Sequence, residues 1–308
     1  LWIYLEAVFS GGDIARQLPQ EAKRFTNIDK SWMKIMDAAH SNPNVIGFVV
    51  REELLRNLLP HLQESLEACQ KSLAGYLEAK RALFPRFFFV SDAQLLEILG
   101  QGSDPHSIQS HLVSIFDNLA TAKFDKVHTN HIIGMVSKEG EQVALEEPVV
   151  AQGNIEDWLN MLKTEMQRTL KSIVRGMASN ILSVFAENDK EKFESFIQNH
   201  PAQVGILGIQ FYWTAMSEEA LTRAKTEKSA LSQVAKNFAK ALSQLVEFTT
   251  KKLTSTERTA IETLITIHIH QVDISLELMK SRLKSPEDFE WLKQTRLYWR
   301  PDIDDTVI

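Results

Sequence analysis

The sequence predicts a mainly α-helical protein: an elongated stack of antiparallel helical bundles that carries a small β-hairpin or sheet as an insertion. Only 12 glycines and 9 prolines interrupt 308 residues, so turns are few and the elements between them are long. Apolar residues recur at steps of three and four along most of the chain, which is the spacing of amphipathic helices. One segment departs from this pattern, because two apolar runs there flank a turn that contains Gly140.

The composition argues against several classes of binding partner, although it leaves room for a local basic patch. A chain of 308 residues is too long for one simple core, so we expect two or more packed subdomains. The net charge is −6 with both signs interspersed, whereas nucleic acids and acidic membranes are bound through positive surfaces, and we expect neither partner. No uncharged apolar stretch approaches the ~20 residues that cross a bilayer. The single cysteine cannot form a disulfide within the chain, which favours a reducing compartment, the cytoplasm.

Residues 1–83 are predicted to form an N-terminal helical subdomain. We expect its clearest helix to start at Pro60, because proline cannot donate the backbone hydrogen bond of a helix interior. An apolar stripe on this helix includes Cys69, which we interpret as a small buried hydrophobe. The stripe consists of Leu62, Leu66, Cys69, Leu73 and Tyr76.

Residues 84–153 are predicted to form a mixed α/β subdomain. It opens with an aromatic, non-helical run over 84–90, after which Ser91 and Gln94 have the spacing of a capping box. A second short helix is expected to run from Asp104 through Phe116, since Pro105 fits a first helical turn.

The predicted β-hairpin covers residues 131–146, and we expect Pro148 to end it. Its apolar runs flank a charged turn made of Lys138, Glu139, Gly140 and Glu141.

A long bridging helix is predicted over residues 154–187. Asn154 fits the N-cap, and an apolar stripe continues over 155–186, which would be ~48 Å of unbroken helix. Gly176 lies in its second half, where glycine costs ~1 kcal/mol relative to alanine. We interpret Gly176 as either a soft point or a site of close helix approach.

Residues 188–308 are predicted to form a C-terminal helical bundle. Two long helices are expected at about 227–253 and 256–283, the second capped by Ser255 or Thr256.

A dense aromatic segment follows this bundle. Ser285 fits an N-cap and Pro286 a first helical turn. Aromatic density of this kind is typical of a core anchor or a docking face. The predicted docking anchor consists of Phe289, Trp291, Leu292, Tyr298 and Trp299.

No motif for catalysis or cofactor binding is present. The sequence lacks both a G-x-x-x-x-G-K-[S/T] loop and a G-x-S-x-G elbow, and we interpret Gly100 and Gly102 as a helix end and turn. His128 and His131 lack the further ligands that zinc needs, and His268, on an apolar helix face, is expected to hydrogen-bond a neighbour. We therefore predict no catalytic, cofactor-binding or metal-binding residue.

Three longer strings carry a resemblance to a known family. The chain opens with LWIYLEAVF at residues 1–9, continues with FPRFFFVS at 84–91 and has SPEDFEWLKQTRLYWR at 285–300. These strings resemble the linker region of dynein heavy chains, most closely axonemal outer-arm chains of the gamma type. Leu1 is not an initiator methionine, and residues 304–308 look like the start of another apolar segment, so we expect a fragment of a longer polypeptide.

The resemblance implies a mechanical lever that arches over a ring of six AAA+ modules in the same heavy chain. In that family the linker bends and straightens as the ring cycles ATP, and this swing is the power stroke of ciliary and flagellar movement. ATP and Mg²⁺ are held in the ring, microtubules by a separate stalk, and associated chains by the tail. The fragment would be no enzyme and hold no cofactor, while its parent would be a microtubule motor ATPase of the axoneme. The C-terminal bundle would lead toward the first AAA+ module.

Two hypotheses and one alternative follow. The bridging helix is expected to bend at Arg175, Gly176 and Met177, where helix propensity breaks. The hairpin turn, Lys138 to Glu141, is expected to project and contact the ring reversibly. The alternative is a helical protein-protein interaction scaffold without a mechanical role, which would expose an apolar groove.

Overall fold

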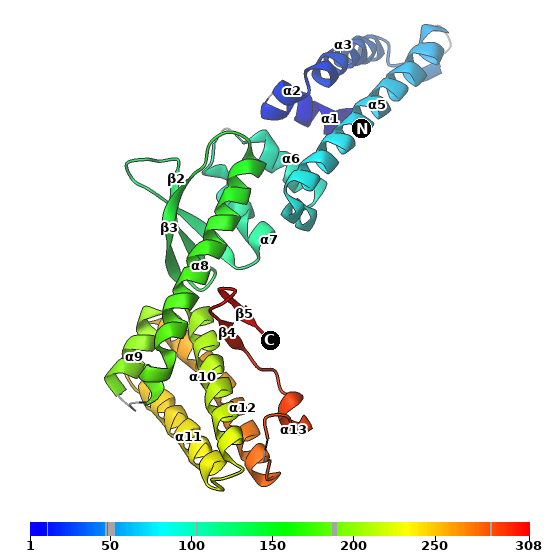
Figure 1. Cartoon of the computed structure of the whole chain (residues 1–308). Coiled ribbons are helices and arrows are strands. Elements are labelled where there is room, and N and C mark those ends of the chain that lie inside the picture. The colour runs from blue at the N-terminus through cyan, green and yellow to red at the C-terminus, as the bar shows by residue number, and fades with distance from the viewer. Residues whose placement is uncertain (11, 47, 49–52, 103, 187–189, 284) are drawn as a thin grey trace. The chain divides into compact units, whose positions relative to one another are not determined.

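The computed structural model describes residues 1–10, 12–46, 48, 53–102, 104–186, 190–283 and 285–308. These residues form two compact units (Figure 1). The first unit comprises 1–138 and 147–164, and the second comprises 139–146 and 165–308. Long helices dominate both units and only short strands are present, so the predicted mainly α-helical class is confirmed. The predicted subdomain boundaries stay a prediction, and residues 187 and 188, where two of them meet, lie outside the described residues.

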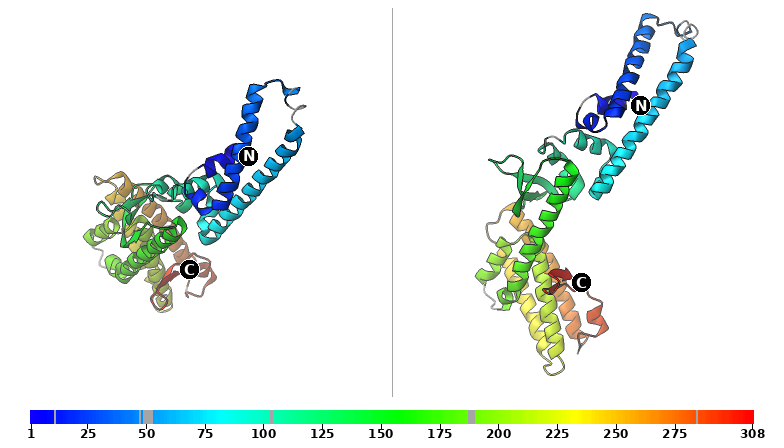
Figure 2. Two further views of the ribbon diagram at one scale, coloured as in Figure 1. Left: turned by 90° about the horizontal axis from the view of Figure 1, so that it is seen from above. Right: turned by 45° about the horizontal axis from the view of Figure 1, so that its top comes forward.

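The first unit begins with a helical layer. The side chains of Phe9 and Phe25 pack with ring centroids 5.9 Å apart. Cys69 and Leu73 on α5 are buried, as the apolar stripe predicted. Figure 2 shows α3 and α5 running side by side. The helices of this layer are α1 (Trp2–Phe9), α2 (Asp13–Gln17), α3 (Pro19–Ser41) and α5 (Glu53–Leu83).

Pro60 does not mark the start of its helix, contrary to the prediction, because α5 begins at Glu53 and includes this proline. Proline removes the backbone hydrogen bond that its own nitrogen would donate, and its ring crowds the carbonyl one turn earlier, but both effects are confined to that turn. The helical turns on either side keep their own hydrogen bonds.

Short helices lie between α5 and the strands. The Ser91 side chain accepts a hydrogen bond from the Gln94 backbone, and the Gln94 side chain accepts one from the Ser91 backbone, which confirms the capping box. The aromatic run, which was predicted to be non-helical, instead forms a 3-10 helix over Pro85–Phe89. The predicted 104–116 helix is two shorter pieces. These elements are η1 (Pro85–Phe89), α6 (Asp92–Gly100), η2 (Ser107–His111) and α7 (Leu112–Phe116).

The sheet has three strands rather than the two of the predicted hairpin. The strand order is β1-β2-β3, with β1 antiparallel to β2 and two register irregularities between them. Pro148 does not end β3, contrary to the prediction, because β3 is an edge strand and an edge tolerates a residue without an N–H donor. The strands are β1 (Leu119–Phe124), β2 (His131–Ser137) and β3 (Gln142–Val150).

The bridging helix is α8 (Ile155–Ala186), which matches the predicted stripe at both ends. Its residues 155–164 belong to the first unit and 165–186 to the second. At its start, the carbonyl oxygen of Asn154 accepts a hydrogen bond from the backbone N–H of Asp157 at 3.2 Å.

The second unit is a helical bundle, in which α10, α11 and α12 pack side by side (Figure 1). Trp213, Phe238 and Trp291 are central to its core. Its elements after α8 are α9 (Lys190–Asn199), α10 (Ala202–Arg223), α11 (Ala230–Phe248), α12 (Ser255–Lys280), α13 (Phe289–Leu292), β4 (Tyr298–Arg300) and β5 (Asp305–Val307).

Two helix starts differ from the predictions. Thr254, not Ser255 or Thr256, caps α12, because its side chain forms a reciprocal capping box with Glu257. Helix α13 begins at Phe289 after an Asp288 N-cap, so Ser285 and Pro286 lie before the helix. The β4–β5 pair was not predicted, since strands of three residues are too short to show a period. No helix among the described residues is long and apolar enough to cross a membrane.

Candidate functional site: the polar contacts of helix α8

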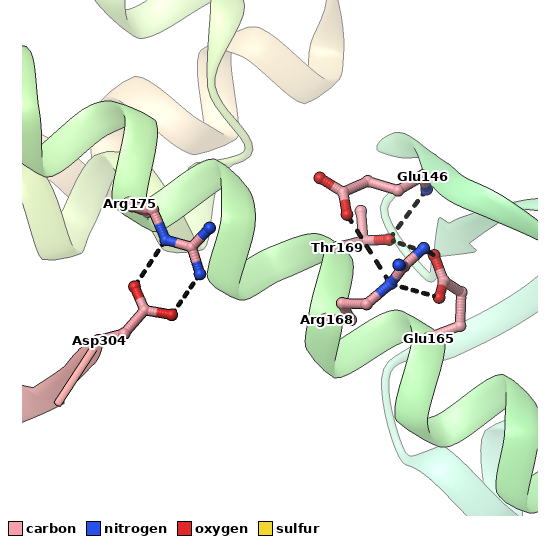
Figure 3. A network of polar contacts seen from close by, with 6 residues as sticks. All are labelled: Glu146, Glu165, Arg168, Thr169, Arg175 and Asp304. Carbon is pink, nitrogen blue, oxygen red and sulfur yellow. Dashed lines mark hydrogen bonds and ion pairs between the residues drawn. The ribbon is translucent and has the colours of Figure 1, made fainter.

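Helix α8 holds the turn between β4 and β5 through an ion pair (Figure 3). Arg175 donates two hydrogen bonds to Asp304: Nε to Oδ1 at 2.6 Å, and the second guanidinium nitrogen to Oδ2. Lys171, one turn earlier, adds its charge at 4.0 Å from Asp304 and 3.8 Å from Asp305. The hydrogen bonds from Arg175 lower the pKa of the Asp304 carboxyl. Asp304 has a positive φ of 51°, a backbone conformation that few residues other than glycine adopt. The bidentate ion pair with Arg175 holds Asp304 in this conformation.

A second cluster lies about two turns nearer the start of α8 (Figure 3). The Thr169 hydroxyl accepts a hydrogen bond from the backbone N–H of Glu146 at 3.1 Å and donates to Glu165 at 3.3 Å. Arg168 donates to Glu165 at 2.8 Å and lies 3.8 Å from the Glu146 carboxylate. These contacts bind the first half of β3 to α8 within the second unit.

The three residues of the predicted hinge have different surroundings. The Arg175 side chain is exposed and ion-paired, whereas Met177 is 2% exposed and belongs to the core. A Cβ added to Gly176 would meet nothing within 4 Å, so the alternative that Gly176 allows a close helix approach is wrong. A hinge at these residues stays a prediction.

The close approach to α8 occurs instead at Gly208 of α10, which the sequence analysis missed. A Cβ there would lie 2.7 Å from Phe196 Cζ, 3.0 Å from Met177 Sδ and 3.1 Å from Ile181 Cδ1. Only glycine fits such a contact without moving its neighbours. The available signal was the pair Gly205 and Gly208, three residues apart on one apolar helix.

The hairpin turn makes contacts within the chain. The Lys138 ammonium donates to the Asp117 carboxylate at 3.3 Å in the first unit. In the second unit, the Thr256 hydroxyl donates to the backbone carbonyl of Glu139 at 3.2 Å, and Gly140 takes a positive φ of 88°.

Glu141 at the end of this turn caps α10. Its Oε1 accepts a hydrogen bond from the backbone N–H of Ala202 at 2.8 Å, at a helix start where Pro201 has no side-chain acceptor. The carboxylate satisfies a backbone donor and complements the positive end of the helix. The turn is therefore held within the second unit at Glu139 and Glu141 instead of projecting freely. Contact of the turn with a ring stays a prediction.

The predicted docking anchor divides into buried and exposed residues. Trp291 is 0% exposed and packs on Trp213 with ring centroids 5.1 Å apart, and Trp299 packs against the same core. Phe289 is 73% exposed and Leu292 is 46% exposed. Trp291 and Trp299 therefore anchor the segment in the second unit, whereas Phe289 and Leu292 face away from its core.

Glu218 on α10 organises the polar side of this anchor, and the sequence analysis missed it. Its carboxylate accepts hydrogen bonds from Trp291 Nε1 at 3.3 Å and from the Tyr298 hydroxyl, and Arg296 lies 3.8 Å away. Burial, with the hydrogen bond to Glu218, raises the pKa of the Tyr298 phenol to about 12. Tyr298 is therefore a hydrogen-bond donor throughout the physiological pH range.

The histidine pair lies at the start of β2, the central strand of the sheet. The His128 and His131 rings are 5.0 Å apart, and the His131 backbone N–H donates to the His128 carbonyl at 2.8 Å. Within the described ranges, no three His, Cys, Asp or Glu side chains gather as a metal site would require. The expected lack of a metal stays a prediction.

The described residues are mainly packed helices that are joined by caps and ion pairs. A family model described as "Dynein heavy chain, N-terminal region 2" matches residues 1–177. Over the whole chain, the sequence is 55% identical to rat dynein axonemal heavy chain 5 and 52% identical to human dynein axonemal heavy chain 8. It is 46% identical over its whole length to the dynein gamma chain of the flagellar outer arm of Chlamydomonas reinhardtii.

These matches show that the chain belongs to the dynein heavy chain family and corresponds to an N-terminal region of its axonemal members. The chain spans 9% of the rat relative and 7% of the human and algal relatives.

Proposed function

We propose that this chain is the linker of an axonemal dynein heavy chain, a lever that bends and straightens over the AAA+ ring of the same heavy chain. Its swing would produce the power stroke on microtubules in a cilium or flagellum. Membership of the dynein heavy chain family and similarity to axonemal members support this proposal. ATP binding and hydrolysis, microtubule binding by the stalk, and binding of associated chains by the tail would belong to other parts of the parent.

The structural observation that carries the proposal is α8. This helix of 32 residues contributes to both compact units, and it is tied within the second unit by Arg175 and Thr169. Bending a packed helix disturbs many van der Waals contacts at once, so such a helix resists deformation and can transmit force.

The lever is tested by single-molecule energy transfer in the parent motor. One dye is placed on Lys240→Cys, an exposed position of α11, and a second dye on the AAA+ ring. We expect the distance between the dyes to differ between ATP-bound and nucleotide-free motors. One unchanged distance in both states would refute the lever.

We further propose that α8 bends at Arg175, Gly176 and Met177 during the swing. The substitution Gly176→Ala raises helix propensity by ~1 kcal/mol in open space and should stiffen this point. The expected result is a smaller linker swing and slower microtubule gliding. Gly75→Ala in α5 is the matched control, because its Cβ also meets nothing within 4 Å. Equal swing and gliding in both variants would place the hinge elsewhere.

We also propose that the hairpin turn contacts the ring. Reversing the charges of Lys138 and Glu139 should slow ATP turnover of the parent motor, because charges at a rim tune docking. Asp117→Asn is the control, since it removes the Lys138 ion pair within the chain and leaves the turn's charges unchanged. Turnover that is slowed equally in the control would argue against a ring contact.

An interaction scaffold without a mechanical role is the second candidate function. The exposed aromatic side chains of Phe88 and Phe89 favour it, since adjacent exposed phenylalanines are typical of binding surfaces. A scaffold predicts that Phe88→Ser and Phe89→Ser abolish the assembly of the heavy chain with its partners while the dye distances stay independent of nucleotide. A lever predicts the reverse.

A further inference from the structure

One edge of the three-stranded sheet is closed by a side chain. Gln109, at the centre of η2, forms two hydrogen bonds with the backbone of Ala122 in β1. The Ala122 N–H donates to Gln109 Oε1 at 2.9 Å, and Gln109 Nε2 donates to the Ala122 carbonyl at 2.8 Å. A side-chain amide carries the same donor and acceptor as a peptide group. Gln109 therefore pairs with β1 as the backbone of an adjacent strand would.

The register of the sheet shows that these Ala122 groups face outward. Ala122 lies opposite Met135 of β2, in a regular stretch of the antiparallel ladder. Successive residues of a strand direct their backbone donors and acceptors to alternate sides, so Thr121 and Lys123 bond toward β2 while Ala122 points away. In the strand order β1-β2-β3 of the described residues, β1 has a neighbouring strand on one side only. Without Gln109, Ala122 would present a complete template for a further strand.

The opposite edge of the sheet is closed by other means. The Glu146 N–H of β3 donates to the Thr169 hydroxyl at 3.1 Å, so position 146 faces outward. By the same alternation position 148 also faces outward, and it is occupied by Pro148, which has no N–H to donate. An added strand would thus find one outward donor of β3 in use and the next one missing. At β1, by contrast, one replaceable side chain supplies the closing hydrogen bonds.

The segment that covers β1 is short. Both η2 and α7 pack against β1, and Ile108 of η2 is buried in the core. A 3-10 helix of five residues has few internal hydrogen bonds, and their geometry is poorer than in an α-helix. Ile108 therefore anchors η2 in the core, while Gln109 ties it to the strand edge. Loss of the bonds to Ala122 should raise the population of molecules in which this edge is locally open.

We propose that the β1 edge is a strand-addition surface that the Gln109 amide keeps closed, and that the partner it fits is β1 of a second copy of this chain. Two identical strands paired antiparallel about Ala122 place Lys123 opposite Thr121. Like charges therefore do not lie directly opposite each other, and each Ala122 gives its donor and acceptor to the other copy. The surface requires neither a hinge nor a ring, so it is independent of the lever.

The test follows exchange of the Ala122 amide hydrogen by NMR in the 308-residue chain, with analytical ultracentrifugation of the same samples. In dilute Gln109→Ala, this hydrogen should exchange at least about tenfold faster than in wild type, because the hydrogen bonds that hold the edge closed are lost. At higher concentration, Gln109→Ala should associate at least about tenfold more tightly than wild type, because more molecules are open. Ala122 should then regain protection from exchange as the new strand pair forms.

Two further variants make the result specific. Gln109→Glu keeps an acceptor for the Ala122 N–H but has no donor for the Ala122 carbonyl, so both effects should appear in reduced form. This variant also carries the test if circular dichroism shows that Gln109→Ala does not fold. Gln63→Ala is the matched control, because it removes a glutamine that is hydrogen-bonded to Glu67 within α5, and it should behave as wild type.

Three results would each overturn the proposal. The first is equal exchange of the Ala122 amide in wild type and in the folded Gln109 variants. The second is association of these variants that is no tighter than that of wild type or Gln63→Ala. The third is association that leaves the Ala122 amide unprotected, since the copies would then meet at another surface.

Discussion

Gly176 and Gly208 allow the packing of α8 to be measured by one chemical change made at two places. Both glycines lie inside helices, and replacing either with alanine gains up to about 1 kcal/mol of helix propensity. At Gly176 the added Cβ meets nothing, so Gly176→Ala should raise stability by about that amount.

At Gly208 the same methyl group has no room. It would lie 2.7 Å from Phe196 Cζ and 3.0 Å from Met177 Sδ, closer than carbon atoms pack without displacement. Overpacking of this kind costs about 1–3 kcal/mol. After the gain in propensity, Gly208→Ala should destabilise the fold by about 0–2 kcal/mol. The two variants share the gain in helix propensity, so the difference between their stabilities, about 1–3 kcal/mol, measures the overpacking cost alone.

The assay is differential scanning calorimetry of the 308-residue chain and both variants. For a unit of this size, each kcal/mol shifts Tm by about 2–4 °C, so Gly208→Ala should melt about 2–12 °C below Gly176→Ala. Combining Gly208→Ala with Phe196→Leu should recover part of the stability that is lost to the clash with Phe196. The second substitution removes the end of the ring that lies nearest the new methyl group. A Gly208→Ala protein that melts as high as Gly176→Ala would refute this account of α8 packing.

Three further predictions concern the second unit. Trp291→Ala should cost about 3–5 kcal/mol in urea unfolding because it empties a fully buried site, whereas Leu292→Ala, at a half-exposed site, should cost much less. Glu141→Ala should cost about 0.5–2 kcal/mol by removing the cap on α10, and Glu141→Gln, which keeps an acceptor, should cost less; equal losses would exclude the cap. Burial lowers the pKa of His268 below 6.5, so as pH falls through 6.5 the unfolded chain binds this proton first and stability is lost. Unfolding free energies at pH 7.5 and 5.5 measure that loss, which His268→Gln should reduce.

Local patterns in the sequence determined the class of fold and several elements. The bounds of α8 follow from an apolar stripe that repeats every three or four residues, and the start of α6 follows from Ser91 and Gln94. Each of these signals depends on residues a few positions apart, within one element. The position of His268 on an apolar face likewise predicted a hydrogen-bonded neighbour, and its Nε2 donates to the Phe238 carbonyl at 2.9 Å.

Single-residue rules were less reliable. Pro60 and Pro148 each lack a backbone donor, and each was predicted to bound an element, yet α5 and β3 continue through them. The free-energy cost of a missing N–H donor depends on its surroundings. In a helix, the hydrogen bonds of the neighbouring turns hold the helix together around a proline. In an edge strand, a proline can be tolerated because one side of the strand has no partner strand.

Tertiary structure alone decided the contacts of the candidate site. Arg175 and Asp304 are 129 residues apart, and Glu141 and Ala202 are 61 apart, so no local period connects either pair. The sequence placed Gly176 correctly in α8 but could not show that the tight contact lies at Gly208. Spacing along a chain determines which face of an element is apolar. Which faces then meet, and at what distance, depends on the packing of all elements together.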